Sequence, residues 1–301
     1  MNRLKSVLVG VDFSECSTAA LHQAARLAQW NKATLHVLHV VDAPAVAGLA
    51  KAMKMDVEQQ REMAQTAARR ELSRCLGRHT LPDGWQSEAV VGAPLDTILD
   101  RAREVKADLI VLGERGSNTA SPQVGLVALR VLRRSPVKVL LVDSDTTAPF
   151  QRVIACVDFA PSCREVIEQA RRLAALNACR VDFLHIYDPP WDRLRYVLPA
   201  LSLSEELRQQ YLNMLDSQLA DFVGSLSGLD ARLVLRESPR YQSGIALHAQ
   251  LENADLILLA TNARRTPGDE LLGSTAERLV RELPCSVLVV KPSPPANAPN
   301  G

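Results

Sequence analysis

The stretch ADLIVLGERG, residues 107–116, decides how the chain around it folds. Its first six residues are apolar except for Asp108, a pattern typical of a strand that is buried on both faces of a parallel sheet. The strand runs into a turn that carries Gly113 and Gly116, and residues 124–134 then show helical spacing of apolar side chains. A glycine turn between a buried strand and a helix amino terminus can hold an anion. The same glycines could equally do no more than shape the turn.

Length and composition indicate two α/β domains. The chain has 301 residues, which suits two domains of about 150 residues each. Aromatic residues make up only 4% while aliphatic residues and alanine dominate, which favours helices on a parallel sheet over a β-sandwich. The formal net charge of +1 provides no overall field for nucleic acid or an anionic membrane, so we expect neither as a partner.

The cysteines and the amino terminus bear on the cell compartment. The six cysteines form no C-x-x-C pair and have no zinc-like spacing with the six histidines, so we expect reduced thiols and no metal site. The chain enters a strand directly, without an apolar signal segment, and contains no apolar run of about 18 residues. A cytoplasmic protein is expected.

Strands and helices are predicted to alternate through the first half. Buried apolar runs predict the five strands, helical spacing predicts the helices between them, and Ser14 or Ser17 can cap the first helix. The strands are expected at residues 5–12, 34–41, 86–91, 108–112 and 137–142, the helices at residues 21–28, 53–76, 94–105 and 124–134, and a loop at residues 42–50.

The pattern returns in the second half. Residues 7–44 laid on residues 153–190 agree at 14 of 38 positions, against about two or three expected for unrelated sequences. This agreement indicates an internal duplication. The polar segment 143–149 separates the copies, which gives a first domain at residues 1–146 and a second at residues 150–292. The last residues, 293–301, are rich in Pro, Asn and Ala and are expected to be disordered.

Both halves carry motifs of one known family. In the first half these are VDFS at 11–14, LHVVD at 38–42, GAP at 92–94 and ADLIVLG at 107–113. In the second half they are VDF at 157–159, LHI at 184–186, ADLI at 254–257, GSTAERL at 273–279 and PCSVLVV at 284–290. Over residues 5–292 the chain thus resembles a tandem, E-type member of the universal stress protein family.

The resemblance implies a fold and a place for a ligand. Each half would form a doubly wound α/β domain with a five-stranded parallel sheet in the order 3-2-1-4-5 and helices on both faces. Ligands of such folds lie at the carboxyl ends of the strands where the order reverses. Asp12 and Gly113 would meet there.

ATP-binding members of the family carry G-2x-G-9x-G-(S/T) after the fourth strand, and neither half matches this pattern fully. In the first half only eight residues separate Gly116 from Gly125, and Leu126 takes the hydroxyl position. In the second half Gly273 and Ser274 are kept, but alanines 260 and 263 replace the first two glycines, and Ala160 takes the place of Ser14. An alanine forced to positive φ would cost roughly 1 to 2 kcal/mol and would place a methyl group near a phosphate.

The resemblance therefore implies candidate contacts for ATP or another adenine nucleotide in each half. These are Asp12, Val40, Gly113, Gly116 and Gly125 in the first domain, and Asp158, Ile186, Gly273, Ser274 and Thr275 in the second.

Each candidate also has a purely structural interpretation. Asp12 and Asp158 could end a strand and cap the next helix. The repeated histidines, His39 and His185, could simply pack near a strand end. Arginines 264 and 265 could meet phosphates or remain solvated in their loop.

Three functions stay open from the sequence. The first is a non-enzymatic stress-response protein that binds an adenine nucleotide in one of its two degenerate sites. The second is a ligand-free scaffold that presents residues 53–76 and 204–223 to unknown protein partners. The third is a weak nucleotide hydrolase, which lacks an evident water-positioning base and a P-loop lysine. Residues 187–203 also raise the possibility of an elongated apolar ligand in the second domain. No Ser-His-Asp, metal or thiol site is expected.

The fifth strand of each half is apolar and would lie at a sheet edge. Exposed apolar edges seek partners. Family members pair through this strand, so the two halves, through residues 137–142 and 286–290, are expected to form an intramolecular pseudo-dimer. Pairing of two chains into a homodimer is a further possibility.

Overall fold

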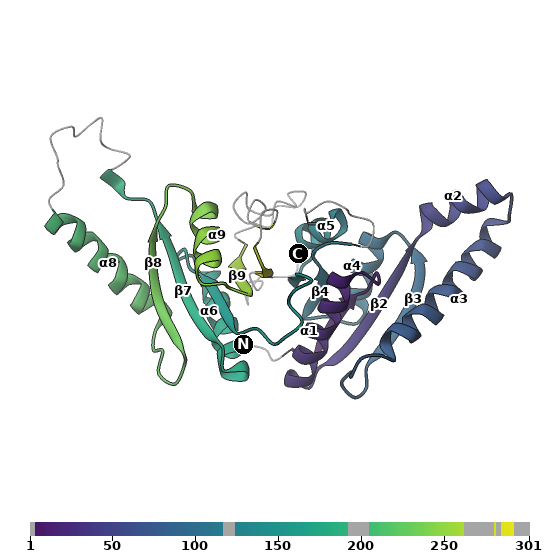
Figure 1. The fold of residues 1–301 in the computed structure, drawn as a ribbon, viewed down its shortest axis with the longest axis horizontal. Helices are drawn as coiled ribbons and strands as arrows, with labels where there is room; N and C mark the ends of the chain where they lie inside the picture. The colour runs from purple at the N-terminus through teal and green to yellow at the C-terminus, as the bar shows by residue number, and fades with distance from the viewer. Residues whose placement is uncertain (1–3, 117–123, 192–204, 262–279, 281–283, 292–301) are drawn as a thin grey trace, which may run out of the picture. The chain divides into compact units, whose positions relative to one another are not determined.

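Two compact units make up the chain, residues 1–149 and 150–301. The computed structural model describes residues 4–116, 124–191, 205–261, 280 and 284–291 (Figure 1). The expected disordered tail lies outside these residues. No helix in the described part of the chain is long and apolar enough to cross a membrane.

The first unit alternates strands and helices as expected. Its strands pair in parallel in the order β3-β2-β1-β4-β5, the order implied by the family resemblance. The strands are β1 (Ser6–Gly10), β2 (Thr34–Asp42), β3 (Gln86–Gly92), β4 (Leu109–Gly113) and β5 (Lys138–Val142), and the helices are α1 (Glu15–Asn31), α2 (Ala43–Met53), α3 (Val57–Leu76), α4 (Pro94–Glu104) and α5 (Leu126–Arg134).

The second unit repeats this order as β8-β7-β6-β9-β10, again with parallel pairs. Counterpart strands begin 145 to 148 residues apart, close to the offsets of 146 to 148 that the sequence comparison gave, so the duplication is confirmed in three dimensions. The strands are β6 (Arg152–Cys156), β7 (Arg180–Tyr187), β8 (Ala231–Glu237), β9 (Leu256–Ala260) and β10 (Ser286–Val290), and the described helices include α6 (Cys163–Asn177), α8 (Glu205–Val223) and α9 (Tyr241–Leu251).

Helices cover the sheet of the first unit. Helix α1 packs on β1, β4 and β5, α3 packs on β3 and β2, and α4 packs on α5 and β2. The central strands β1 and β4 carry side chains that are almost fully buried, including Val7, Leu8, Ile110 and Val111. A sheet buried by helices leaves mainly its strand ends accessible, and a ligand site is expected at such an end.

An aspartate repeated in the two halves joins the fourth strand of each sheet to the first. The carboxylate of Asp108 accepts hydrogen bonds from the backbone N–H groups of Lys5 and Ser6, at 2.6 and 3.1 Å. In the second unit Asp255 accepts from Gln151 and Arg152 in the same way, at 2.7 and 3.1 Å. The polar residue that interrupts each apolar run therefore has a structural role.

One sequence prediction about the first unit is wrong. Residues 42–50 were expected to form a loop, but they belong largely to α2, and α3 begins only at Val57, after the cap residue Asp56. Alanine-rich sequence favours a helix, Pro44 is tolerated in the first turn, and Val46 and Ala50 are buried. The 11-residue helix α2 therefore takes the place of the loop, and the long helix that was expected from residue 53 is α3, which begins at Val57.

Candidate functional site

A cavity of about 520 Å³ lies in the first unit at the carboxyl ends of β1, β2 and β4. The first residues of α4 and α5 complete its wall. Its volume falls in the range of pockets for small organic ligands. It also lies where the strand order reverses, between β1 and β4, which is the ligand position expected of this topology.

All five candidates from the first half line this cavity. They come from four separate segments of the chain, namely Asp12 after β1, Val40 in β2, Gly113 and Gly116 at the end of β4, and Gly125 before α5. The expectation that Asp12 and Gly113 meet at the strand ends is therefore met in the structure. Whether these residues touch a nucleotide remains a prediction.

Asp12 joins the start of α1 to the glycine turn. Its Oδ1 accepts hydrogen bonds from the backbone N–H and the hydroxyl of Ser14, at 3.1 and 2.6 Å. Ser14 is the N-cap of α1 and accepts from the N–H of Ser17 at 3.1 Å. A Cβ atom on Gly116 would lie 2.9 Å from Oδ2 of Asp12, so the turn passes directly over this carboxylate. The aspartate thus has a structural role as well as a place in the cavity wall.

Close packing, and not backbone conformation, explains the glycine at position 113. A Cβ atom there would lie 2.7 Å from the backbone of Cys16 and Ser17 in the first turn of α1. Neither Gly113 nor Ala260 of the second unit has a positive φ, so the expected cost of a positive φ at this position is wrong. By contrast, a Cβ on Gly125 would make only ordinary contacts, the nearest at 3.5 Å to the carbonyl of Glu114.

His39 packs at the strand end. Its Nδ1 lies 2.7 Å from the carbonyl oxygen of Val11 and must carry the proton, because a carbonyl only accepts. The ring of Phe13, whose φ is 65°, lies 4.4 Å from the imidazole between centroids. His185 makes the same bond to Val157 at 2.8 Å and the same contact with its phenylalanine neighbour. These contacts are accounted for if both histidines simply pack near a strand end.

Sequence reasoning missed an ionic cluster in the glycine turn. Glu114 is only 5% exposed, and its Oε1 lies 3.2 Å from Nε of Arg115. The same guanidinium contacts Asp143, just after β5, at 3.0 Å. Burial raises the pKa of Glu114 to about 7, Asp143 adds to the rise, and Arg115 opposes it. The signal in the sequence that could have indicated this cluster was the glutamate between the two glycines of the turn.

The corresponding part of the second unit is built differently. Asp158 accepts hydrogen bonds from the N–H of Ala160 at 3.0 Å and from the thiol of Cys163 at 2.9 Å. Burial raises the pKa of that thiol to about 12. The side chain of Ile186 is 4% exposed in β7. The other candidates of this half, Gly273, Ser274 and Thr275, lie outside the described residues, as do Arg264 and Arg265.

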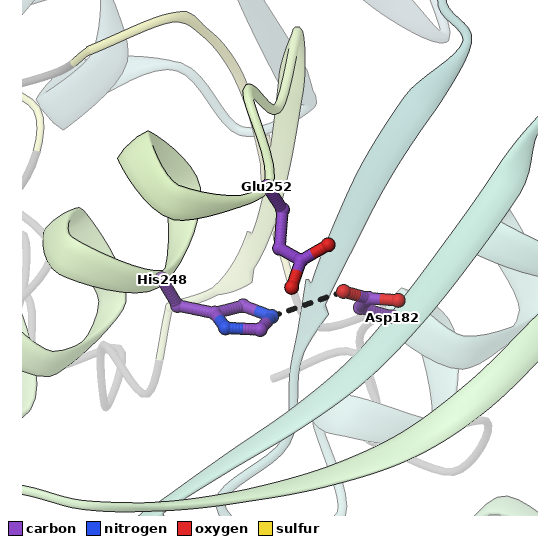
Figure 2. Close-up of side chains that lie close together, drawn as sticks. All are labelled: Asp182, His248 and Glu252. Atoms are coloured by element: carbon purple, nitrogen blue, oxygen red, sulfur yellow. Dashed lines mark hydrogen bonds and ion pairs between the residues drawn. The ribbon is translucent and has the colours of Figure 1, made fainter.

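A second polar cluster, also missed from the sequence, lies between β7 and the end of α9. Asp182, His248 and Glu252 each offer one atom that could bind a metal ion, and these atoms lie within 4.8 Å of one another (Figure 2). Asp182 comes from β7, whereas the other two come from α9 and its C-cap. Asp182 lies 66 positions before His248 in the sequence, so no motif spacing connects it to the two residues at the end of α9.

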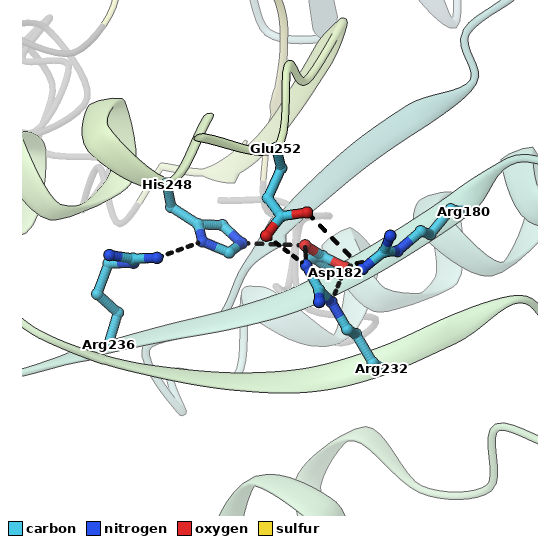
Figure 3. Close-up of polar contacts among 6 residues, drawn as sticks. All are labelled: Arg180, Asp182, Arg232, Arg236, His248 and Glu252. Atoms are coloured by element: carbon cyan, nitrogen blue, oxygen red, sulfur yellow. Dashed lines mark hydrogen bonds and ion pairs between the residues drawn. The ribbon is translucent and has the colours of Figure 1, made fainter. Parts of the chain in front are cut away.

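Arginines occupy the positions around these carboxylates (Figure 3). Arg232 contacts Asp182 through two bonds of 2.7 and 2.8 Å and also contacts Glu252 at 2.7 Å. Arg236 donates to Nδ1 of His248, whose Nε2–H then donates to Asp182 at 3.0 Å. A metal ion would have to displace a guanidinium from both carboxylates. The geometry therefore favours an ion-pair network that joins β7, β8 and α9.

The fold and the cavity define a tandem α/β protein with a cavity at the switch point of its first sheet. The family model described as the universal stress protein family matches residues 3–143 and 149–291. The chain belongs to this family.

Relatives span the whole chain or one half of it. A universal stress protein of Mycolicibacterium smegmatis is 26% identical over 297 residues, which cover 95% of this chain and 97% of the relative. A universal stress protein of Mycobacterium tuberculosis is 30% identical over 146 residues, which cover 47% of this chain and 98% of the relative.

Solved structures show the same fold. A universal stress protein from Archaeoglobus fulgidus matches with a TM-score of 0.66 at 18% identity, over 95% of this chain and 98% of its own. A protein of Pseudomonas aeruginosa PAO1 matches with a TM-score of 0.66 at 20% identity, over 96% and 93% of the two chains.

Proposed function

We propose that this protein is a non-enzymatic stress-response protein whose first unit binds an adenine nucleoside or nucleotide. The observation that carries the proposal is the cavity of about 520 Å³, whose wall holds all five contacts implied for the first half. Ligand occupancy would alter the surface formed by the glycine turn and the start of α5. The proposed setting is the cytoplasm, which agrees with six cysteines that are all free.

The first test looks for a ligand that is already bound. Freshly purified protein is denatured, and released small molecules are identified by mass spectrometry with their amount per chain. We expect close to one adenine compound per chain. Gly125→Leu, which fills the cavity wall, should reduce this amount strongly, whereas Gly48→Leu should not, because a Cβ at Gly48 meets open space on α2.

The alternative function is a scaffold that binds no small ligand. Exposed apolar side chains on α3 and α8 favour it, since Met63 and Met214 are each 53% exposed. Large apolar side chains in contact with water are a common feature of protein-binding surfaces. If nothing is released on denaturation and neither adenosine, AMP nor ATP raises the melting temperature, the scaffold is the better account.

We also propose that the two units pair as an intramolecular pseudo-dimer. Two tandem copies of one family domain and an apolar fifth strand in each copy, β5 and β10, support this arrangement. Small-angle scattering should give the dimensions of one compact particle. A curve that fits two separate, freely moving domains would contradict the proposal, and a doubled mass would show the further homodimer.

A further inference from the structure

The charges around the cavity bear on which adenine compound it accepts. Among the described residues that line it, Arg115 is the sole lysine or arginine, while Asp12, Asp42 and Glu114 are acidic. The wall is therefore poor in the cations that would offset a polyphosphate.

The one guanidinium is already engaged. Arg115 contacts the carboxylate of Glu114 at 3.2 Å and that of Asp143 at 3.0 Å. A phosphate that recruited it would draw the guanidinium away from Glu114. Since Glu114 is 5% exposed, a negative charge there is poorly screened by water.

The amino terminus of α5 offers limited compensation. The N–H of its cap residue, Gly125, already donates to the carbonyl oxygen of Glu114 at 2.7 Å. Leu126 follows where ATP-binding relatives place a hydroxyl, and its side chain is 61% exposed. The remaining N–H groups of the first turn and the helix dipole can favour one phosphate. The described residues at the start of α5, Leu126, Val127 and Ala128, offer no side-chain donor to further phosphates.

We propose that Glu114 sets the charge of the ligand, so that the cavity prefers an adenine nucleoside or monophosphate to a triphosphate and accepts more negative charge when Glu114 is protonated. This inference rests on the proposed function. The carboxyl group faces Arg115 in its own turn, Asp143 and Asp145 after β5, and Asp12 after β1 lies beyond the turn at Gly116. Its Oε2 is buried and has no hydrogen-bond partner among the described residues.

The proton linkage follows from the burial of this group. With the pKa of Glu114 at about 7, roughly a tenth of the molecules are protonated there at pH 8 and roughly nine tenths at pH 6. When only one protonation state is competent, apparent affinity scales with the fraction in that state. Binding of a polyphosphate should therefore strengthen about tenfold from pH 8 to pH 6, whereas adenosine carries no charge and should bind equally at both.

The experiment is calorimetric titration of the full chain with adenosine, AMP and ATP at pH 8 and pH 6. We expect adenosine to bind at least tenfold more tightly than ATP at pH 8. Glu114→Gln should raise ATP affinity at pH 8 about tenfold and remove the protein's share of the pH dependence. Because phosphate itself titrates in this range, that share is the difference between wild type and Glu114→Gln. Glu62→Gln, an exposed position on α3, is the matched control.

The outcomes are distinct. ATP binding to the wild type as tightly as adenosine at pH 8, or an unchanged pH dependence in Glu114→Gln, overturns the role of Glu114 and leaves the proposed function standing. No binding of any of the three compounds at either pH overturns the proposed function as well. Should Glu114→Gln fold poorly, the comparison of adenosine with ATP in the wild type at pH 8 still decides the charge preference.

Discussion

At the scale of single residues, the glycine turn after β4 shows how similar residues serve different ends. A Cβ atom added at Gly113 would collide with the backbone of α1, and one added at Gly116 would collide with the carboxylate of Asp12. A Cβ atom at Gly125 would meet neither. Glu114, in the same turn, is a buried acid beside one arginine. These differences allow packing effects and ligand effects to be separated by substitution.

Gly113→Ala should destabilise the first unit, because its methyl group would overlap the backbone of Cys16 and Ser17. Overpacking of this kind costs about 1 to 3 kcal/mol. Gly125→Ala is the matched control and should change the free energy of unfolding by less than about 1 kcal/mol, since its Cβ makes ordinary contacts. Urea unfolding measures both. Equal stabilities would show that α1 can move away from β4.

Glu114→Gln should also change the pH dependence of stability. The folded-state pKa of Glu114 is raised from 4.5 to about 7, so its contribution is present below pH 4.5 and is lost as pH rises through about 7. Relative to wild type, the variant should gain about 3 kcal/mol of stability between pH 4 and pH 8. Thermal unfolding across this range tests the gain, and Glu62→Gln should follow the wild type. Parallel curves for wild type and Glu114→Gln would mean that Glu114 is ionised at neutral pH.

At the scale of elements, polar side chains connect strands and helices in both units. Asp108 and Asp255 fasten the fourth strand of each sheet to the first. In the second unit Asp182 links β7 to β8 through Arg232 and to α9 through His248 (Figure 3). Such contacts join segments whose distance in sequence is large, and each can be tested by its effect on stability.

Asp108→Ala should lower the stability of the first unit by about 2 kcal/mol or more. The substitution removes the acceptor of two backbone N–H groups, and each lost bond to a charged acceptor costs about 1.5 to 3 kcal/mol before water compensates. Asp83→Ala, at an exposed position between α3 and β3, should have little effect. Chemical unfolding measures the stability of both variants. If Asp108→Ala lost no more stability than Asp83→Ala, the role given to Asp108 would be contradicted.

The second unit should weaken in acid through Asp182. Burial alone would raise the pKa of Asp182, but hydrogen bonds from His248 and Arg232 outweigh it and lower the pKa to about 2. The contribution, about 2 kcal/mol, is present above the unfolded pKa near 4 and is lost as pH falls through 2. Asp182→Asn should therefore destabilise the unit at pH 7 and much less at pH 2. Unfolding followed by circular dichroism measures the stability of both proteins. If Asp182→Asn lost as much stability at pH 2 as at pH 7, this linkage would be excluded.

At the scale of the whole molecule, the duplication has produced one fold with two different switch-point regions. The first unit has Gly113 at the end of β4 and Ser17 in α1, whereas the second has Ala260 and Cys163 at the corresponding positions. The two copies have therefore diverged where a ligand would bind, while their sheet order is conserved.

A ligand of the first unit should stabilise one unit selectively. At a hundredfold excess over its dissociation constant, adenosine should add about 2.7 kcal/mol to the unit that binds it. Calorimetry should then show a rise in only one of two unfolding transitions, and Gly125→Leu should abolish it. A rise in both transitions would point to a second site or to coupled unfolding of the units.

The sequence by itself determined the duplication and the succession of strands and helices, because period-2 and period-3.6 patterns and repeated motifs are local properties. The strand order and the candidate residues of the first cavity came from the family resemblance that those motifs carry. Only the tertiary structure showed α2, which packs against α3 and β2. It also showed why Gly113 must be small and placed Asp143 beside the buried Glu114. It brought Asp182, His248 and Arg232 together from three elements. Such contacts depend on which side chains the folded sheet and helices bring within a few ångströms, which no spacing along the chain encodes.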